Sequence, residues 1–93
     1  MPRFVREVSI TAQNTFSDAI GLSGNFSFSL SGTWVATVHL QRSRDDGTTW
    51  NDVGAYTTNT EDAGYEPAGG MLYRVGVKTG NFTSGTIVAA LYK

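Results

Sequence analysis

The chain has no cysteine and only one histidine among its 93 residues. Disulfides are therefore excluded, and one chain cannot assemble a structural zinc site from the usual four Cys or His ligands. A domain of this length buries a modest fraction of its surface, so it is usually marginally stable without such cross-links. That leaves good packing or oligomerisation as the source of stability, and we expect oligomerisation to be part of the answer.

The sequence also lacks an excess of either charge sign and has no long apolar run. Seven Lys plus Arg face eight Asp plus Glu, for a formal net charge of −1, and these residues are scattered along the chain. No basic patch is available for nucleic acid. No apolar run approaches membrane-spanning length or follows the N-terminus as a signal peptide would. We therefore expect neither a nucleic-acid nor a membrane partner, and no export by that route.

Helical periodicity is absent too, whereas apolar and polar residues alternate with period two along most of the chain. The clearest case is the segment 26–30, in which Phe26, Phe28 and Leu30 alternate with serines. Successive side chains of a strand point to opposite faces, so the large ones should face a core and the serines water. About seven short strands at this spacing predict an all-β fold, a small antiparallel β-sandwich of Ig-like or jelly-roll-like type. We expect residues 1–93 to form this single domain.

The expected core consists of the large apolar residues on the inward parity of these strands. Residues 33–42 predict one long half-buried strand, whereas 57–70 is polar, contains Pro67 and should be mostly loop with at most a short edge strand near 62–66. Residues 86–92 are apolar on both parities, which is typical of a strand covered on both faces or buried in a subunit contact. The core residues predicted are Phe26, Phe28, Leu30, Trp34, Val38, Leu40, Tyr73, Val75 and Val77.

The most specific local signal is the octet 43–50, which matches the pattern Ser-x-Asp-x-Gly-x-Thr-Trp known as the Asp box. We interpret its defining residues, Ser43, Asp45, Gly47, Thr49 and Trp50, as a structural hairpin. The aspartate should accept hydrogen bonds from backbone N–H groups across the turn, and the glycine should take a positive φ. The tryptophan should cover the loop. The motif resembles the rim turns of sialidase-type propeller blades, but one copy cannot form a propeller.

No constellation of catalytic residues emerges from the sequence. His39 has no second histidine or cysteine with which to form a ligand set or a nucleophile pair. The adjacent carboxylates at 45–46 and 61–62 lie in turn-rich sequence, where such groups cap the backbone or meet water. Calcium held by the aspartates at 45, 46 and 52 is a weaker alternative. We predict no catalytic residue, no metal, no cofactor and no enzymatic activity.

Three segments carry a resemblance to a known group of proteins: Thr37–Ser43, Asp46–Trp50 and Tyr73–Gly80. Through them the chain resembles small virion-associated β-proteins of tailed bacteriophages, over roughly two thirds of its length. The resemblance implies a capsid decoration (cement) or head-associated accessory protein, made in the host cytoplasm and located in the phage head or tail. It implies binding to the major capsid protein or other virion proteins as a homo-oligomer, with a trimer favoured, and it transfers no active site.

Two further interpretations stay open. A tail fibre or adaptor component, or a carbohydrate- or receptor-binding module, would use aromatics expected to be exposed, such as Tyr56, Tyr65 and Phe82. A second likeness, to immunoglobulin-like and fibronectin-type sandwiches, assigns Tyr73 the role of a tyrosine whose hydroxyl bonds to an upstream backbone group.

Overall fold

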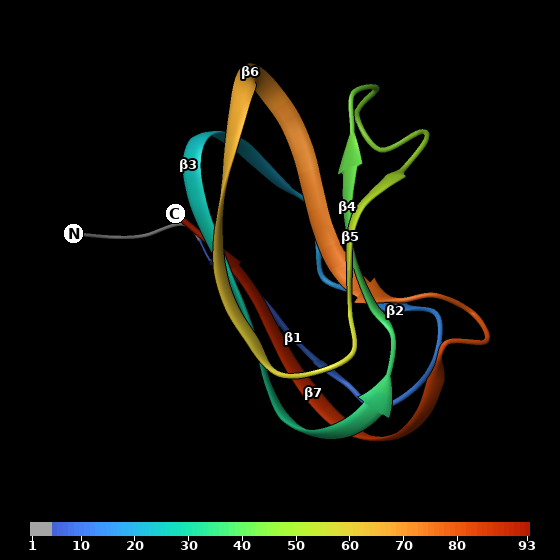
Figure 1. The fold of residues 1–93 in the computed structure, drawn as a ribbon. Coiled ribbons are helices and arrows are strands. Elements are labelled where there is room, and N and C mark those ends of the chain that lie inside the picture. The colour runs from blue at the N-terminus through green and yellow to red at the C-terminus, as the bar shows by residue number, and fades with distance from the viewer. Residues whose placement is uncertain (1–4) are drawn as a thin grey trace.

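The fold is all-β, as predicted, and forms a small antiparallel sandwich (Figure 1). The computed structural model describes residues 5–93, and at 69 and 70 it describes the backbone only. Within this range all strand pairing is antiparallel and no helix occurs. The strands are β1 (Val5–Ile10), β2 (Thr15–Phe16), β3 (Ile20–Ala36), β4 (Val38–Ser43), β5 (Asn51–Tyr56), β6 (Thr60–Val77) and β7 (Phe82–Tyr92).

One hydrogen-bonded sheet supplies both layers because its two longest strands bend together. The strand order is β1-β7-β3-β6-β4-β5, and β2 also pairs with β6. In the ribbon of β3 and β6, residues 24–30 pair with 60–66, and residues 20–22 pair with 71–73. Between these stretches Ser23 alone faces residues 67–70 of β6, so the ribbon folds over at this bulge. Figure 1 shows β6 rising on one side, turning over at the top and descending on the other.

The bend divides the strands into two layers. The first layer contains β1, β7, the C-terminal part of β3 and the N-terminal part of β6. The second layer contains β5, β4, β2, the C-terminal part of β6 and the first residues of β3. Pro67 lies at the bend, where its missing N–H breaks no ladder hydrogen bond, and Gly24 has a φ of 71° that a side chain would resist.

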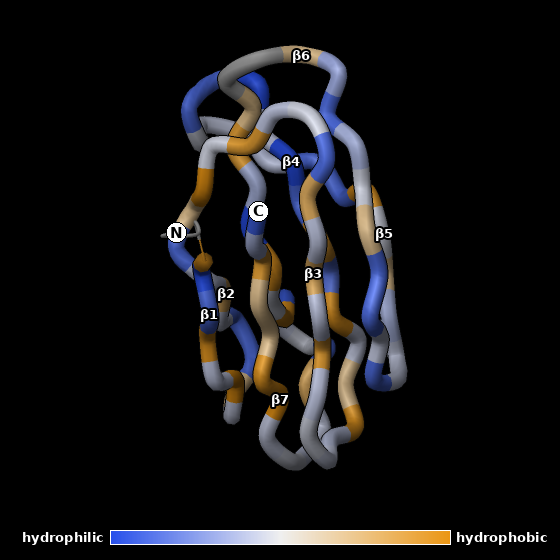
Figure 2. The backbone as a smooth tube through the Cα atoms, turned by 90° about the vertical axis from the view of Figure 1, so that its left-hand side faces the viewer, coloured by the Kyte–Doolittle hydropathy of each residue, from blue (hydrophilic) through white to orange (hydrophobic). Residues whose placement is uncertain are grey.

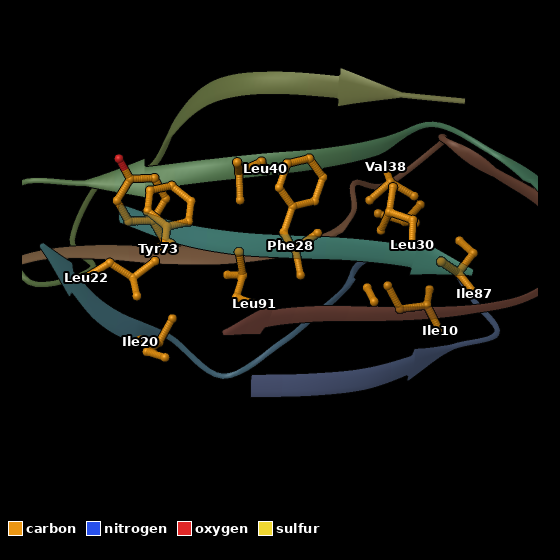
Figure 3. Close-up of a cluster of buried hydrophobic side chains, with 14 residues drawn as sticks. Ile10, Ile20, Leu22, Phe28, Leu30, Val38, Leu40, Tyr73, Ile87 and Leu91 are labelled. Atoms are coloured by element: carbon orange, nitrogen blue, oxygen red, sulfur yellow. The ribbon is translucent and has the colours of Figure 1, made fainter. Parts of the chain in front are cut away.

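The core lies between the layers, and Figure 3 shows side chains from both converging there. Eight of the nine residues predicted for the core are buried; the exception, Trp34, is half-buried and packs against the cluster from the end of β3. Its indole N–H needs an acceptor and donates to Oδ1 of Asn59 at 2.8 Å, so the ring stays at the rim. Four large apolar residues outside the nine predicted ones are also fully buried: Ile10, Leu22, Ile87 and Leu91.

The prediction of one strand across 33–42 is wrong, because β3 ends at Ala36 and β4 begins at Val38. Thr37 lies between them, and its backbone N–H donates to the carbonyl of Asn81 at 2.9 Å. At this residue the chain crosses from the first layer to the second. The apolar parity continues across the crossing, which is why sequence periodicity did not reveal it.

The prediction that 57–70 is mostly loop is also wrong. Strand β6 begins at Thr60 and continues to Val77, so most of the segment is strand. Its residues 60–66 pair with β3 alone, so the edge position allowed for 62–66 is confirmed, although the strand is longer than expected. Glu61 and Asp62 point to opposite faces and are both exposed, because this stretch has no second neighbouring strand to cover it. Gly64 leaves room for the ring of Phe26, since a Cβ at position 64 would lie 2.6 Å from Cζ of that ring. The glycine that suggested a loop is therefore required by the packing of the strand.

Candidate functional site

The hairpin between β4 and β5 is held by hydrogen bonds within residues 43–49. The carboxylate of Asp45 accepts the backbone N–H of Thr49 at 2.9 Å, the hydroxyl of Thr49 at 2.6 Å and the hydroxyl of Ser43 at 2.8 Å. The Ser43 hydroxyl oxygen in turn accepts the N–H of Gly47 at 2.8 Å, and Gly47 has a φ of 88°. These bonds, first of all that from the Thr49 hydroxyl, lower the pKa of Asp45 to about 2. The carboxylate is thus engaged inside the turn.

Trp50 follows this hairpin and takes part in a stack on the outer face of the second layer. The guanidinium of Arg74 lies 4.0 Å from the ring centroid of Phe16 and 4.4 Å from that of Trp50. Arginine stacked on aromatic rings gains a cation–π attraction and loses side-chain freedom. The stack therefore joins β2, the end of the hairpin and β6 through one cation.

A polar network continues from this stack across the layer. The Nε–H of Arg74 donates to Oε1 of Gln41 at 2.8 Å, and Nε2 of Gln41 donates to Oδ1 of Asp52 at 2.9 Å. Lys78 completes the network with an ion pair of 2.6 Å to Oδ2 of Asp52. The hydrogen bonds from Lys78 and then Gln41 lower the pKa of Asp52. Gln41 is only 5% exposed, so its amide is fixed in one orientation by both neighbours.

A hollow of 380 Å³ adjoins this network. Its walls come from β2 and the residues before it, from β4, and from the end of β6 with the turn that follows. They are formed by Asn14, Phe16, Gln41, Arg74, Lys78 and Thr79.

His39 lies on β4, one residue from the fully buried Val38, and shows no catalytic arrangement. Its Nδ1 is buried and has no hydrogen-bond partner among the described residues. Burial, followed by the positive charge of Lys78, lowers the pKa of His39, so the ring is neutral near pH 7. A neutral imidazole in this position packs within the sheet.

The most buried carboxylate, Glu66, was not foreseen from the sequence. Its side chain is 1% exposed and accepts four hydrogen bonds near the bend in β6. Arg42 donates two of them, at 2.6 and 2.9 Å, and the Tyr73 hydroxyl and the Ala68 N–H donate the others, at 2.6 and 2.9 Å. The bonds from Arg42 are the first cause that lowers the pKa of Glu66 to about 2, and burial first, then the bond to Glu66, raises the pKa of Tyr73 to about 12.

This cluster changes the role expected of Tyr73. Its hydroxyl bonds to the side chain of Glu66 seven residues upstream, not to a backbone group as in the tyrosine of immunoglobulin-like sandwiches. Because Glu66 lies in the first layer, and Arg42 and Tyr73 lie in the second, the cluster joins the layers at the bend. It is a structural site.

The outer face of the first layer carries mostly short side chains, together with Glu7, Glu61 and Tyr92, in rows across the strands. Directly paired residues of an antiparallel sheet point to the same face, so the pairing gives the rows. We call the following residues the serine face: Val5, Tyr92, Ser27 and Ala63; Glu7, Ala90, Ser29 and Glu61; and Ser9, Val88 and Ser31. Figure 2 looks onto this layer, with neutral to apolar residues along the middle of β7 and β3. Ala90 is 7% exposed and Val88 is half-buried, so residues 87–92 of β7 are largely covered on both sides, whereas 83–86 are exposed.

Of the three aromatics considered for ligand binding, only Tyr65 is exposed, at 66%. Tyr56 is half-buried and its ring centroid lies 4.9 Å from that of Phe28. Phe82 is half-buried and packs against the core. The expectation that all three are exposed is therefore wrong, because two of them extend the core.

Neither pair of adjacent carboxylates forms a metal or catalytic cluster in the part of the chain that the structure describes. Within residues 5–93 no group of three or more His, Cys, Asp or Glu side chains is placed to hold a metal ion. Glu61 accepts the Tyr92 hydroxyl at 2.5 Å, and Asp62 accepts the Ala63 N–H at 2.8 Å. Over the same range, no helix long and apolar enough to cross a membrane is found.

Comparisons of the chain with protein families, with curated proteins and with solved structures found no match. The physical features of the two outer faces therefore carry the functional argument.

Proposed function

We propose that this chain is a structural protein of a bacteriophage particle. In this proposal it is a capsid decoration or head-associated accessory protein that docks as an oligomer, a trimer by preference, without catalysing a reaction. The proposed location in a phage particle rests on the resemblance of residues 37–43, 46–50 and 73–80 to small tailed-phage proteins. The observation that carries the docking role is the serine face.

The serine face suits broad contact with another protein. Ser, Ala and Val lose little side-chain entropy when they are covered, and short side chains let a partner approach the sheet closely. The two longer dimensions of the molecule are 35 and 31 Å, which correspond to a broad side on the order of 1000 Å². A standard protein interface needs about 800 Å² from each partner. One side of this domain is thus large enough to be an interface.

A free edge of the same layer, at β1, supports assembly. β1 pairs only with β7, and among the described residues its other edge has no neighbouring strand. An unpaired edge offers N–H and C=O groups to a strand of another chain. Val5, at the start of β1, is 39% exposed and adds apolar surface at this edge.

The carboxylates with the most perturbed pKa values support a non-catalytic role. Asp45 is engaged by Thr49 and Ser43 in the hairpin, and Glu66 is engaged by four donors at the bend. Each of these groups has its hydrogen-bonding capacity occupied by the fold itself. Their low pKa values follow from structural hydrogen bonds, which is a common alternative to catalysis.

The test combines particle composition with one substitution in the serine face. Mass spectrometry of purified particles of the phage that encodes the chain should detect it as a particle component. Ser29→Arg places a long cation in the centre of the face and should reduce incorporation at least about tenfold by disrupting close packing. The matched control is Thr48→Arg, at an exposed turn position in the other layer, and it should leave incorporation unchanged.

Light scattering coupled to size-exclusion chromatography measures the oligomer independently. A mass of three chains for the wild type supports the proposed trimer. Particles that lack the chain would overturn the virion role. Equal incorporation of the two arginine variants would overturn the serine face as the docking surface.

A receptor- or carbohydrate-binding module, as in a tail fibre or adaptor, is the second candidate. The 66% exposure of Tyr65 favours it, because an exposed tyrosine ring can stack on a sugar. Glycan-array binding that is lost on Tyr65→Ala and kept on Tyr56→Phe would support this role over docking.

A further inference from the structure

The outer face of the second layer holds a cation that no carboxylate of the described chain neutralises. The ion pairs of the described residues are Arg42 with Glu66 and Lys78 with Asp52. Arg74 uses its Nε–H toward a neutral amide, and within residues 5–93 its Nη1 and Nη2 atoms have no hydrogen-bond partner. The outer edge of this guanidinium is therefore left unpaired by the protein.

The same guanidinium is fixed in place before any ligand arrives. Phe16 and Trp50 cover it at 4.0 and 4.4 Å, and Gln41 holds Nε at 2.8 Å. Gln41 is itself buried and held by Asp52 at 2.9 Å. A ligand that binds such a group has little side-chain freedom left to remove, which favours binding.

The hollow beside Arg74 gives room for a small ligand group. Its volume of 380 Å³ corresponds to on the order of ten water molecules, at about 30 Å³ each. Besides the arginine, its walls offer the amides of Asn14 and Gln41, the hydroxyl of Thr79 and the Phe16 ring. A charged group with further polar atoms, the size of a single sugar acid or an acidic side chain, fits these walls.

The charges of the site favour a singly charged, planar anion. Lys78 is neutralised by Asp52 at 2.6 Å, so the three charged groups sum to one positive charge, which belongs to Arg74. The paired Nη1 and Nη2 donors of a guanidinium match the two oxygens of a carboxylate. We propose that this hollow binds the carboxylate of a ligand, with Arg74 as the bidentate donor and Asn14 and Thr79 contacting the rest of the ligand. The site is on the layer opposite the serine face, so it does not depend on the docking role.

Two sources of carboxylate can be separated with nuclear magnetic resonance on the folded, ¹⁵N-labelled chain. The probes are D-glucuronate, with D-glucose as its neutral control, and a blocked Gly-Asp-Gly tripeptide, with Gly-Asn-Gly as its neutral control. We expect saturable shifts of the Arg74 Nε–H signal and of nearby amides, with half-saturation on the order of 1–10 mM. The neutral controls should cause no saturable shift.

A conservative pair of variants tests the bidentate arginine. Arg74→Lys keeps the positive charge but loses the planar fork, so binding should weaken about tenfold. Arg6→Lys, on β1 in the other layer, is the matched control and should bind as the wild type does. If Arg74→Lys fails to fold, the wild-type Nε–H titration with its neutral controls still decides the question.

The outcomes separate the sources and can overturn the site. Binding of glucuronate alone identifies a sugar acid, binding of the aspartate peptide alone identifies a protein side chain, and either supports the carboxylate site. Absence of saturable shifts with both carboxylates overturns the proposal, as does equal binding of the neutral controls or undiminished binding by a folded Arg74→Lys variant. Inorganic phosphate saturating the site at lower concentration than both carboxylates overturns the choice of ligand class.

Discussion

Replacement of Glu66 by glutamine should cost this small domain a large part of its stability. The carboxylate is 1% exposed and accepts four hydrogen bonds, two from Arg42, one from Tyr73 and one from the Ala68 N–H. In Glu66→Gln, one oxygen still accepts two of these bonds, whereas the new NH₂ group faces two donors. The variant therefore loses the negative charge that strengthens these hydrogen bonds, and it places its NH₂ group against two other hydrogen-bond donors.

The magnitude follows from the lost bonds and from the exposure of their partners. A hydrogen bond to a charged group contributes about 1.5–3 kcal/mol. Arg42 is 33% exposed, so water replaces part of what the guanidinium loses. We expect the free energy of unfolding to fall by about 2–4 kcal/mol. For a domain of this length the Tm should fall by roughly 10–30 °C.

The pH dependence of this loss tests its electrostatic origin. The pKa of Glu66 is lowered from 4.5 to about 2 in the folded chain, so its stabilising effect is fully present above pH 4.5. The effect is lost as the pH falls toward 2, because protons then bind the folded carboxylate as well. The difference in unfolding free energy between wild type and Glu66→Gln should therefore shrink steadily between pH 4.5 and pH 2.

Urea denaturation followed by circular dichroism measures both quantities. The matched control is Glu61→Gln, on the same strand, because Glu61 is exposed and accepts one hydrogen bond, from Tyr92. Its effect should stay within about 0.5 kcal/mol. Equal destabilisation by the two variants, or a Glu66→Gln deficit that is the same at pH 6 and pH 2, would refute the reasoning.

Three further substitutions test the hairpin turn, the close contact between the backbones of β3 and β7, and the core. Asp45→Ala removes the acceptor of the Thr49 N–H, and hydrogen exchange of that amide should accelerate at least about tenfold. Gly85→Ala forces a Cβ onto a backbone carbonyl of β3 at a φ of 97° and should destabilise by about 2 kcal/mol or more, whereas Gly21→Ala, whose Cβ meets one side chain at 4.0 Å, should be nearly neutral in thermal melts. Leu91→Ala empties a fully buried site in β7 and should cost about 3 kcal/mol in urea denaturation; a cost below about 1 kcal/mol would contradict its burial.

Alternation of large and small side chains predicted the fold class and most of the core. The pattern Phe26, Phe28 and Leu30 with intervening serines puts the three apolar residues inside and the serines on the outer face. This works because the period of a strand is fixed by its backbone and depends little on its neighbours. The crossing between the layers at Thr37 was not predicted, because the alternation of apolar and polar residues continues across it.

The length of strand β6 was not predicted, for a different reason. Its residues Glu61 and Asp62 are exposed, whereas Glu66 is buried. Gly64 makes room for the Phe26 ring and Pro67 lies at the bend, and both features depend on the partner strand β3. Sequence signals of this kind describe the residue alone, whereas pairing is decided by segments about 40 residues away.

The two polar sites were beyond sequence reasoning because they join distant segments. Glu66 meets Arg42 across 24 positions, and Arg74 meets Gln41 across 33. The only local signal was a charged residue at a strand position, at Arg42, Glu66 and Arg74 alike. Without the topology, such residues are indistinguishable from the solvent-facing charges that most strands carry.

The position of β7 determines when the chain can fold. This last strand lies between β1 and β3, and Tyr92, the penultimate residue, pairs with Val5 and Ser27. During synthesis β1 therefore has no partner strand until β7 has left the ribosome. Contacts between such remote segments form slowly. Truncation within β7 would therefore remove pairing from the interior of the sheet, on both sides of one strand, rather than from its margin.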